Sequence, residues 1–99
     1  MAIGEISVVP LGTKTASVSQ YVARAVKVLE REKCMKYELT AMGTIVEGDL
    51  DGILAVVKKM HEQVFGEGVA RVVTTVKIDD RRDKPQGIKD KVDSLKKKL

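Results

Sequence analysis

Two segments of the chain alternate between apolar and polar residues, which is the pattern of a β-strand with two different faces. These segments are residues 3–10 and 69–79. Elsewhere apolar residues recur at helical spacing, which predicts amphipathic helices. The predicted helices cover residues 17–33, 50–65 and 88–99.

The stretch between the first two helices predicts two further strands and a helix start. Tyr37 begins two short runs suited to strands, which are interrupted at Met42-Gly43 and end at Gly48. Glycine accepts the backbone conformations of tight turns. Asp49 follows, and its carboxylate can accept a hydrogen bond from the first turn of a helix, where negative charge is also favourable. The stretch therefore predicts strand, turn, strand, turn and helix in succession.

The predicted order is β-α-β-β-α-β with one additional C-terminal helix. This order is that of an α+β, ferredoxin-like fold, in which two helices cover one face of a four-stranded antiparallel sheet. Right-handed crossovers give the strand order 4-1-3-2. We expect a single domain over residues 1–99, in which residues 80–99 form a charged connector and the C-terminal helix.

The second face of this sheet is covered by no helix of the βαββαβ unit. The strand phases place a mixed set of side chains there: Glu5, Ser7, Val9, Glu38, Thr40, Val73, Thr75 and Lys77. In the third strand, either Thr44 and Val46 or Ile45 and Glu47 can face this side. Such a face can be solvated, pack on another copy of the chain, or line a ligand pocket.

Composition narrows the classes of function. The 99 residues carry a net charge of +4, concentrated in lysines of the C-terminal helix. A charge run of this kind is typical of a solvated helix face. The predicted strands contain one aromatic residue, Tyr37, out of phase with Glu38 and Thr40, which argues against base stacking and a nucleic-acid partner. Neither a signal peptide nor a membrane span is predicted, so we expect a cytoplasmic protein with no membrane partner.

Candidate chemistry is sparse. Cys34 and His61 are the single cysteine and histidine, which excludes an internal disulfide and a Cys/His zinc site. We interpret Cys34 as a small, buried or half-buried apolar residue and His61 as a partly buried structural residue at the margin of a helix's apolar face. The sequence contains no phosphate-binding glycine loop and no nucleophile–base constellation. We therefore expect no catalysis, no metal and no required cofactor.

Three motifs resemble a known family. They are Val8-Val9-Pro10 at the end of the first strand, Tyr37-Glu38 in the second, and Thr44-x-x-Glu47-Gly48 in the third. In this order they are similar to the small, single-domain thiamine-binding proteins of the YkoF-like superfamily. The resemblance extends over nearly the whole chain.

The resemblance implies a ferredoxin-like fold that assembles with copies of itself through its sheets, as a homodimer or as a homotetramer built from two dimers. It also implies non-covalent binding of thiamine, or of its hydroxymethylpyrimidine portion, in a pocket against the sheet and near a subunit contact. The positions that match the binding residues of the family are Ser7, Glu38, Thr44 and Glu47, with Met42 at the intervening turn.

The chemistry of these residues suits such a ligand. Glu38 can hydrogen-bond an exocyclic amino group and attract a cation. The hydroxyls of Ser7 and Thr44 can donate to or accept from ring nitrogens, and Met42 offers an adaptable apolar wall. Each also has a purely structural interpretation: Glu38 and Glu47 as solvated or lysine-paired strand residues, the hydroxyls as partners of the backbone. Two alternatives to ligand binding remain, an oligomeric structural or regulatory module and a small-molecule enzyme.

Overall fold

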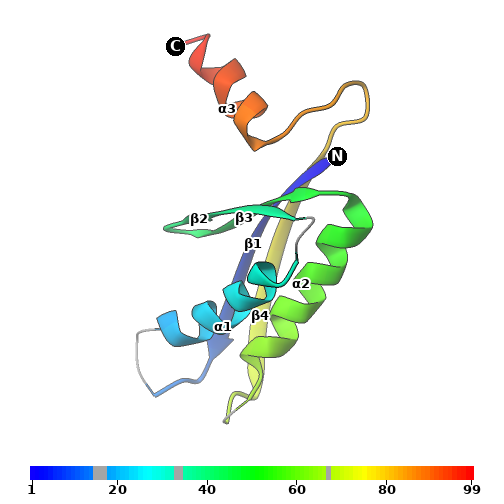
Figure 1. Cartoon of the computed structure of the whole chain (residues 1–99). Helices are drawn as coiled ribbons and strands as arrows, with labels where there is room; N and C mark the ends of the chain where they lie inside the picture. The colour runs from blue at the N-terminus through cyan, green and yellow to red at the C-terminus, as the bar shows by residue number, and fades with distance from the viewer. Residues whose placement is uncertain (15–17, 33–34, 67) are drawn as a thin grey trace.

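The computed structural model describes residues 1–14, 18–32, 35–66 and 68–99 (Figure 1). The predicted order of elements is confirmed. The strands and helices are β1 (Ala2–Leu11), α1 (Ser19–Glu30), β2 (Lys36–Thr40), β3 (Gly43–Gly48), α2 (Leu50–Val64), β4 (Arg71–Asp80) and α3 (Ile88–Lys96).

The four strands form one antiparallel sheet in the order β2-β3-β1-β4, which confirms the predicted arrangement. Both α1 and α2 lie against the same face of this sheet (Figure 1). The other face carries neither helix and is called the open face here. The fold is therefore α+β and ferredoxin-like, as predicted, with α3 added after β4.

The core lies between the sheet and these two helices. The even-numbered residues of β1 face the helices, and Ile6 is almost completely buried among them. Apolar side chains buried around it include Leu29, Val46, Ile53, Val56, Met60 and Val64. The period-two pattern assigns the buried face of β1 correctly, and helical spacing predicts the burial of Leu29, Ile53 and Met60. Val22 and Leu54 also have that spacing but are exposed, because neither lies between its helix and the sheet.

The ends of the two core helices differ in how well the sequence predicts them. The Asp49 carboxylate accepts a hydrogen bond from the Gly52 N–H at 3.3 Å, so the predicted cap of α2 is confirmed. Helix α1 is shorter than predicted, since it ends at Glu30 rather than near residue 33. Val18 occupies its N-cap without a side-chain hydrogen bond. The sequence also offers three hydroxyl residues as the cap of this helix, Ser17 or else Thr15 or Ser19. Ser19 is the first residue of the helix and not its cap. Thr15, Ser17 and Cys34 lie outside the described residues.

His61 has structural partners. It lies half-buried near the end of α2, and its Nδ1 is 2.6 Å from the hydroxyl of Thr74 on β4. The Phe65 ring packs edge-on against the imidazole, with ring centroids 5.2 Å apart. These contacts tie α2 to the sheet and agree with the structural role predicted for this histidine.

The pairing register settles the phase of the third strand. Ile45 lies opposite both Glu5 and Glu38, so Ile45 and Glu47 belong to the open face. Thr44 lies opposite Ile6 and Leu39, so it belongs to the helix-covered face. The residues predicted on the uncovered face of the sheet lie there. In the pairing of β1 with β4, for example, Ser7 lies opposite Thr75 and Val9 lies opposite Val73.

The C-terminal helix lies apart from the two core helices, beyond the end of the sheet where β1 begins (Figure 1). None of its residues is buried. Within the described part of the chain, no helix is long and apolar enough to span a membrane.

Candidate functional site

The five residues singled out from the sequence line two different hollows. Ser7, Met42 and Thr44 line a cleft between α1 and the β2–β3 hairpin, called here the hairpin cleft. Glu38 and Glu47 line a groove between β2, β3 and α3, called here the α3 groove. Because Thr44 and Glu38 belong to opposite faces of the sheet, one small ligand cannot contact all five residues in a single copy of the chain.

The hairpin cleft has the character of a small-molecule site. Its volume is about 690 Å³, within the range of ligand pockets, which are mostly apolar with a few polar groups. Its walls come from the exposed side of α1, the hairpin and β1. The residues that line it are Ile6, Ser7, Val8, Val9, Val18, Ser19, Val22, Ala23, Ala25, Val26, Leu39, Thr40, Ala41, Met42, Gly43, Thr44 and Met60. None of them carries a charge.

Thr44 is the buried polar group of this cleft. It is only 3% exposed, and its hydroxyl makes no hydrogen bond to the described residues. No fully enclosed side-chain oxygen in the described chain lacks a partner, so the Thr44 oxygen keeps some accessible surface, and Thr44 lines the cleft. A hydroxyl in this position can donate one hydrogen bond and accept others. Ser7 also borders the cleft, although its pairing opposite Thr75 assigns its side chain to the open face.

The turn of the hairpin places Met42 at the rim of the cleft. The Thr40 hydroxyl donates to the Gly43 carbonyl at 2.9 Å and accepts from the Met42 N–H at 3.3 Å, which holds the turn together. A Cβ on Gly43 would lie 2.8 Å from the carbonyl oxygen of Ile6, so the close approach of this turn to β1 requires glycine. Met42 is therefore held as an exposed, adaptable apolar wall.

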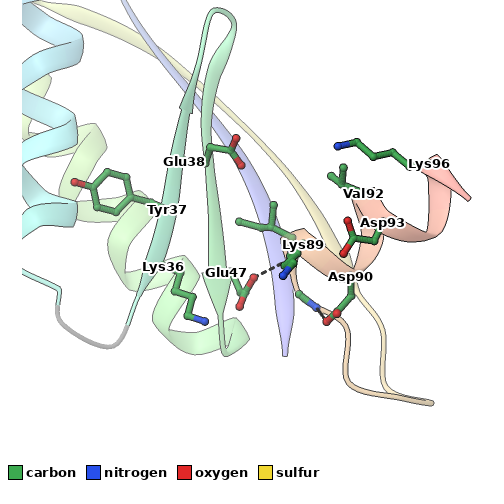
Figure 2. Close-up of a pocket in the computed structure, with 11 residues that line it drawn as sticks. Lys36, Tyr37, Glu38, Glu47, Lys89, Asp90, Val92, Asp93 and Lys96 are labelled. Carbon is green, nitrogen blue, oxygen red and sulfur yellow. Dashed lines mark hydrogen bonds between the residues drawn. The ribbon is translucent and has the colours of Figure 1, made fainter.

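The α3 groove is charged, in contrast to the hairpin cleft. It has a volume of about 660 Å³ and is lined by Lys36, Tyr37, Glu38, Glu47, Gly87, Ile88, Lys89, Asp90, Val92, Asp93 and Lys96. Figure 2 shows Glu38 and Glu47 on the side of the sheet that faces α3, whereas Tyr37 points to the other side. Within the described chain, Glu38 makes neither a hydrogen bond nor an ion pair.

Glu47 has a structural partner in this groove. It is only 9% exposed, and its Oε2 accepts a hydrogen bond from the Ile88 N–H at 2.7 Å (Figure 2). A Cβ on Gly87 would lie 2.6 Å from the same oxygen. The carboxylate therefore satisfies a free N–H group at the start of α3, where negative charge is favourable. This contact was not predicted, because its two residues are 41 positions apart.

The carboxylates whose pKa values are shifted, Asp80 and Asp83, line neither the hairpin cleft nor the α3 groove. In the connector before α3, a bidentate hydrogen bond from Arg81 lowers the pKa of Asp83 to about 2. Arg82 likewise lowers the pKa of Asp80 through a hydrogen bond. These pairs are exposed and shape the connector. No three His, Cys, Asp or Glu side chains are grouped to hold a metal ion in the described part of the chain.

The walls of the hairpin cleft were missed by the sequence interpretation. Helical spacing with Ala25 and Leu29 predicts that Val22 belongs to the buried stripe of the first helix, but Val22 is partly exposed and lines the cleft. Leu39 alternates with Glu38 and Thr40, and it is also exposed above the cleft. The exposed apolar residues beside the buried Thr44 hydroxyl mark the cleft in the structure. The sequence does not mark it, because only the three-dimensional arrangement brings these residues together.

Known proteins resemble this chain over its whole length. The thiamine-binding protein family model matches residues 4–96. The UPF0045 protein YqgV of Bacillus subtilis is 45% identical over all of this chain and 98% of its own. The UPF0045 protein of Methanothermobacter thermautotrophicus is 48% identical over the full length of both chains.

Solved structures share the fold. A hypothetical protein from Methanocaldococcus jannaschii is 44% identical, with a TM-score of 0.87 over 96% of this chain and 95% of its own. A Thermotoga maritima protein, assigned provisionally to thiamine biosynthesis or salvage, is 26% identical, with a TM-score of 0.76 over 95% of this chain and 97% of its own. The chain therefore belongs to the thiamine-binding protein family.

Proposed function

We propose that this protein binds thiamine, or its hydroxymethylpyrimidine portion, without transforming it, and that the pyrimidine ring enters the hairpin cleft. The observation that carries the proposal is Thr44, a buried residue that lines the cleft and whose hydroxyl lacks a partner among the described residues. Family membership and the provisional assignment of the Thermotoga maritima relative support this ligand class.

The chemistry of the cleft suits one half of thiamine in particular. A flat aminopyrimidine presents apolar faces to Val22, Leu39 and Met42, which line the cleft. Its ring nitrogens and amino group can accept from or donate to the Thr44 hydroxyl. No charged residue lines the cleft, and burial of an unpaired charge is costly. The neutral pyrimidine therefore lies inside, and the cationic thiazolium stays at the mouth in contact with water.

Thermal unfolding with hydroxymethylpyrimidine and with thiamine tests the proposal. A ligand at 100 times its dissociation constant stabilises the folded state by about 2.7 kcal/mol. We expect both compounds to raise the melting temperature. No shift with either compound at millimolar concentration would contradict the proposal and favour an oligomeric module without thiamine affinity. Recovery of chemically altered ligand would favour an enzyme.

Two matched variants locate the site. Thr44→Val keeps the shape of the side chain and removes the hydroxyl, so we expect about fivefold weaker binding from the loss of one hydrogen bond of about 1 kcal/mol. Thr75→Val makes the same change on the open face and should leave the affinity unchanged. Glu38→Gln changes the α3 groove instead. If Glu38→Gln weakens binding and Thr44→Val does not, the ligand lies in the groove and the cleft assignment is wrong.

A further inference from the structure

The four methionines of the chain differ in their exposure to solvent. Met42 is 84% exposed and Met60 only 2%, although both line the hairpin cleft. Met35 is partly buried against the core, and Met1 is exposed but does not line the cleft. A thioether that reaches solvent is open to oxidants, whereas a buried one is protected by the dense packing around it. Met42 is therefore the methionine whose oxidation changes the cleft directly.

The hairpin turn holds Met42 at the rim of the cleft through backbone contacts. The Thr40 hydroxyl accepts a hydrogen bond from the Met42 N–H at 3.3 Å and donates one to the Gly43 carbonyl at 2.9 Å. These hydrogen bonds involve the backbone of Met42 and not its side chain. A chemical change confined to the sulfur thus alters the wall of the cleft and leaves the hydrogen bonds of the turn in place.

The apolar character of the cleft makes the polarity of Met42 important. Val22 and Leu39 line the cleft with it, and none of the lining residues carries a charge. The reduced thioether is apolar and polarisable, and it makes favourable contacts with aromatic rings. Oxidation gives a polar, chiral sulfoxide, which loses hydration without gaining a partner when it packs against the face of a ring. The sulfoxide therefore removes one apolar wall from the ring's binding site.

We propose that Met42 is an oxidation site that controls ligand binding in the hairpin cleft, with a hydroperoxide as the oxidant. A sulfur lone pair attacks one peroxide oxygen, and the O–O bond breaks. The sulfur is oxidised by two electrons to the sulfoxide, and the peroxide proton moves to the leaving oxygen, which gives water or an alcohol. Methionine sulfoxide reductases reverse the step with electrons from thiols. This regulation rests on the proposed function, because it acts on the same cleft.

Peptide mass spectrometry after graded treatment with hydrogen peroxide tests the selectivity of the site. In a Cys34→Ser background, which removes the single thiol, we expect Met42 to be oxidised at least about tenfold faster than Met60. Saturating hydroxymethylpyrimidine should slow the oxidation of Met42, because the bound ring covers its sulfur, and leave that of free methionine in the same solution unchanged. Oxidation of Met42 and Met60 at equal rates would overturn the proposal.

Calorimetric titration of the same chain before and after oxidation tests the control of binding. We expect the dissociation constant for hydroxymethylpyrimidine to rise about two- to tenfold when Met42 is the sulfoxide, because the contact between sulfur and ring is lost. Treatment with sulfoxide reductases should restore it. Met42→Leu cannot be oxidised at this position, so its dissociation constant, whatever its value, should be the same before and after peroxide. Met42→Gln places a polar side chain of similar length at the turn and should bind more weakly without peroxide.

The outcomes separate this regulation from the proposed function. If the reduced chain binds neither hydroxymethylpyrimidine nor thiamine, the proposed function fails and the regulation fails with it. If the reduced chain binds and its affinity survives complete oxidation of Met42, the regulation alone is overturned. A peroxide response of equal size in Met42→Leu would assign the effect to another methionine and would also overturn the regulation.

Discussion

Helices α2 and α3 are both amphipathic, but only α2 finds its partner within the chain. Helix α2 buries Ile53, Val56 and Met60 against the sheet and α1, and each is at most 2% exposed. Helix α3 carries a similar stripe and buries none of it. Apolar spacing therefore predicts that a helix needs a partner, but it does not tell whether that partner belongs to the same chain.

The two helices also start differently. Asp49, next to α2 in sequence, caps the first turn of that helix with its own side chain. Helix α3 begins at Ile88, after the N-cap residue Gly87, and the carboxylate of Glu47 from a distant strand accepts a hydrogen bond from the Ile88 N–H. Asp90 adds a local hydrogen bond to the Gly87 N–H at 3.0 Å. The start of α2 is encoded locally, whereas that of α3 depends on the tertiary fold.

The largest expected difference between the helices is in stability. Ile53→Ala should lower the free energy of unfolding by about 2–5 kcal/mol, because it leaves a cavity in a closed core. Leu95→Ala should change it by less than about 0.5 kcal/mol in the monomer, since that side chain is exposed. Urea unfolding at concentrations where the chain is monomeric measures both. Equal losses would show that α3 packs on its own domain.

The cap of α2 should have a smaller effect. Asp49→Ala removes the acceptor for the Gly52 N–H and should cost about 1 kcal/mol of unfolding free energy. Asp49→Asn keeps an acceptor oxygen and serves as the control, with most of the stability retained. If both variants were as stable as the native chain, the start of α2 would not depend on this cap.

The anchor of α3 should affect that helix alone. Gly87→Ala brings a Cβ to within 2.6 Å of the Glu47 carboxylate and should displace the Ile88 N–H from its acceptor. Since a hydrogen bond to a charged group contributes about 1.5–3 kcal/mol, we expect amide exchange in Ile88–Lys96 to accelerate about tenfold or more, with α2 unchanged. Glu38→Gln, in the same groove, is the control. Unchanged exchange in the Gly87 variant would show that α3 is held by other contacts.

The smallest effect concerns the connector. Arg81 lowers the pKa of Asp83 from 3.8 to about 2, so the pair stabilises the folded chain above pH 3.8 and this contribution is lost as the pH falls toward 2. The pair is exposed, and its members are two residues apart. We expect Asp83→Asn to be slightly less stable than the native chain at neutral pH and equal to it near pH 2. A difference that grows in acid would contradict this assignment.

Local patterns predicted most of the fold. Periodicity located the elements, the Asp49 cap located the start of α2, and handedness rules gave the strand order. The phase of β3 could not be predicted, because Ile45 and Val46 are adjacent and both apolar. The pairing of β3 with β1 determines which residues of β3 face the helices, and it places Thr44 and Glu47 on opposite faces of the sheet.

The candidate site was less predictable for the same reason. The residue types at Thr44 and Met42 suggested ligand binding, but the cleft that joins them needs α1 and Leu39 in place. Glu38 and Glu47 were grouped with them by sequence, yet both belong to the open face. Strand register decides which face of the sheet each candidate residue occupies, and short polar motifs do not encode that register.

The most direct test of the central claim is a methyl NMR titration of the native chain with hydroxymethylpyrimidine. If the pyrimidine occupies the hairpin cleft, the methyl signals of Val22, Leu39 and Met42 shift with one common saturation curve, and those of Ile88 and Val92 in the α3 groove do not. Shifts confined to Ile88 and Val92, or no saturable shift, would contradict the account.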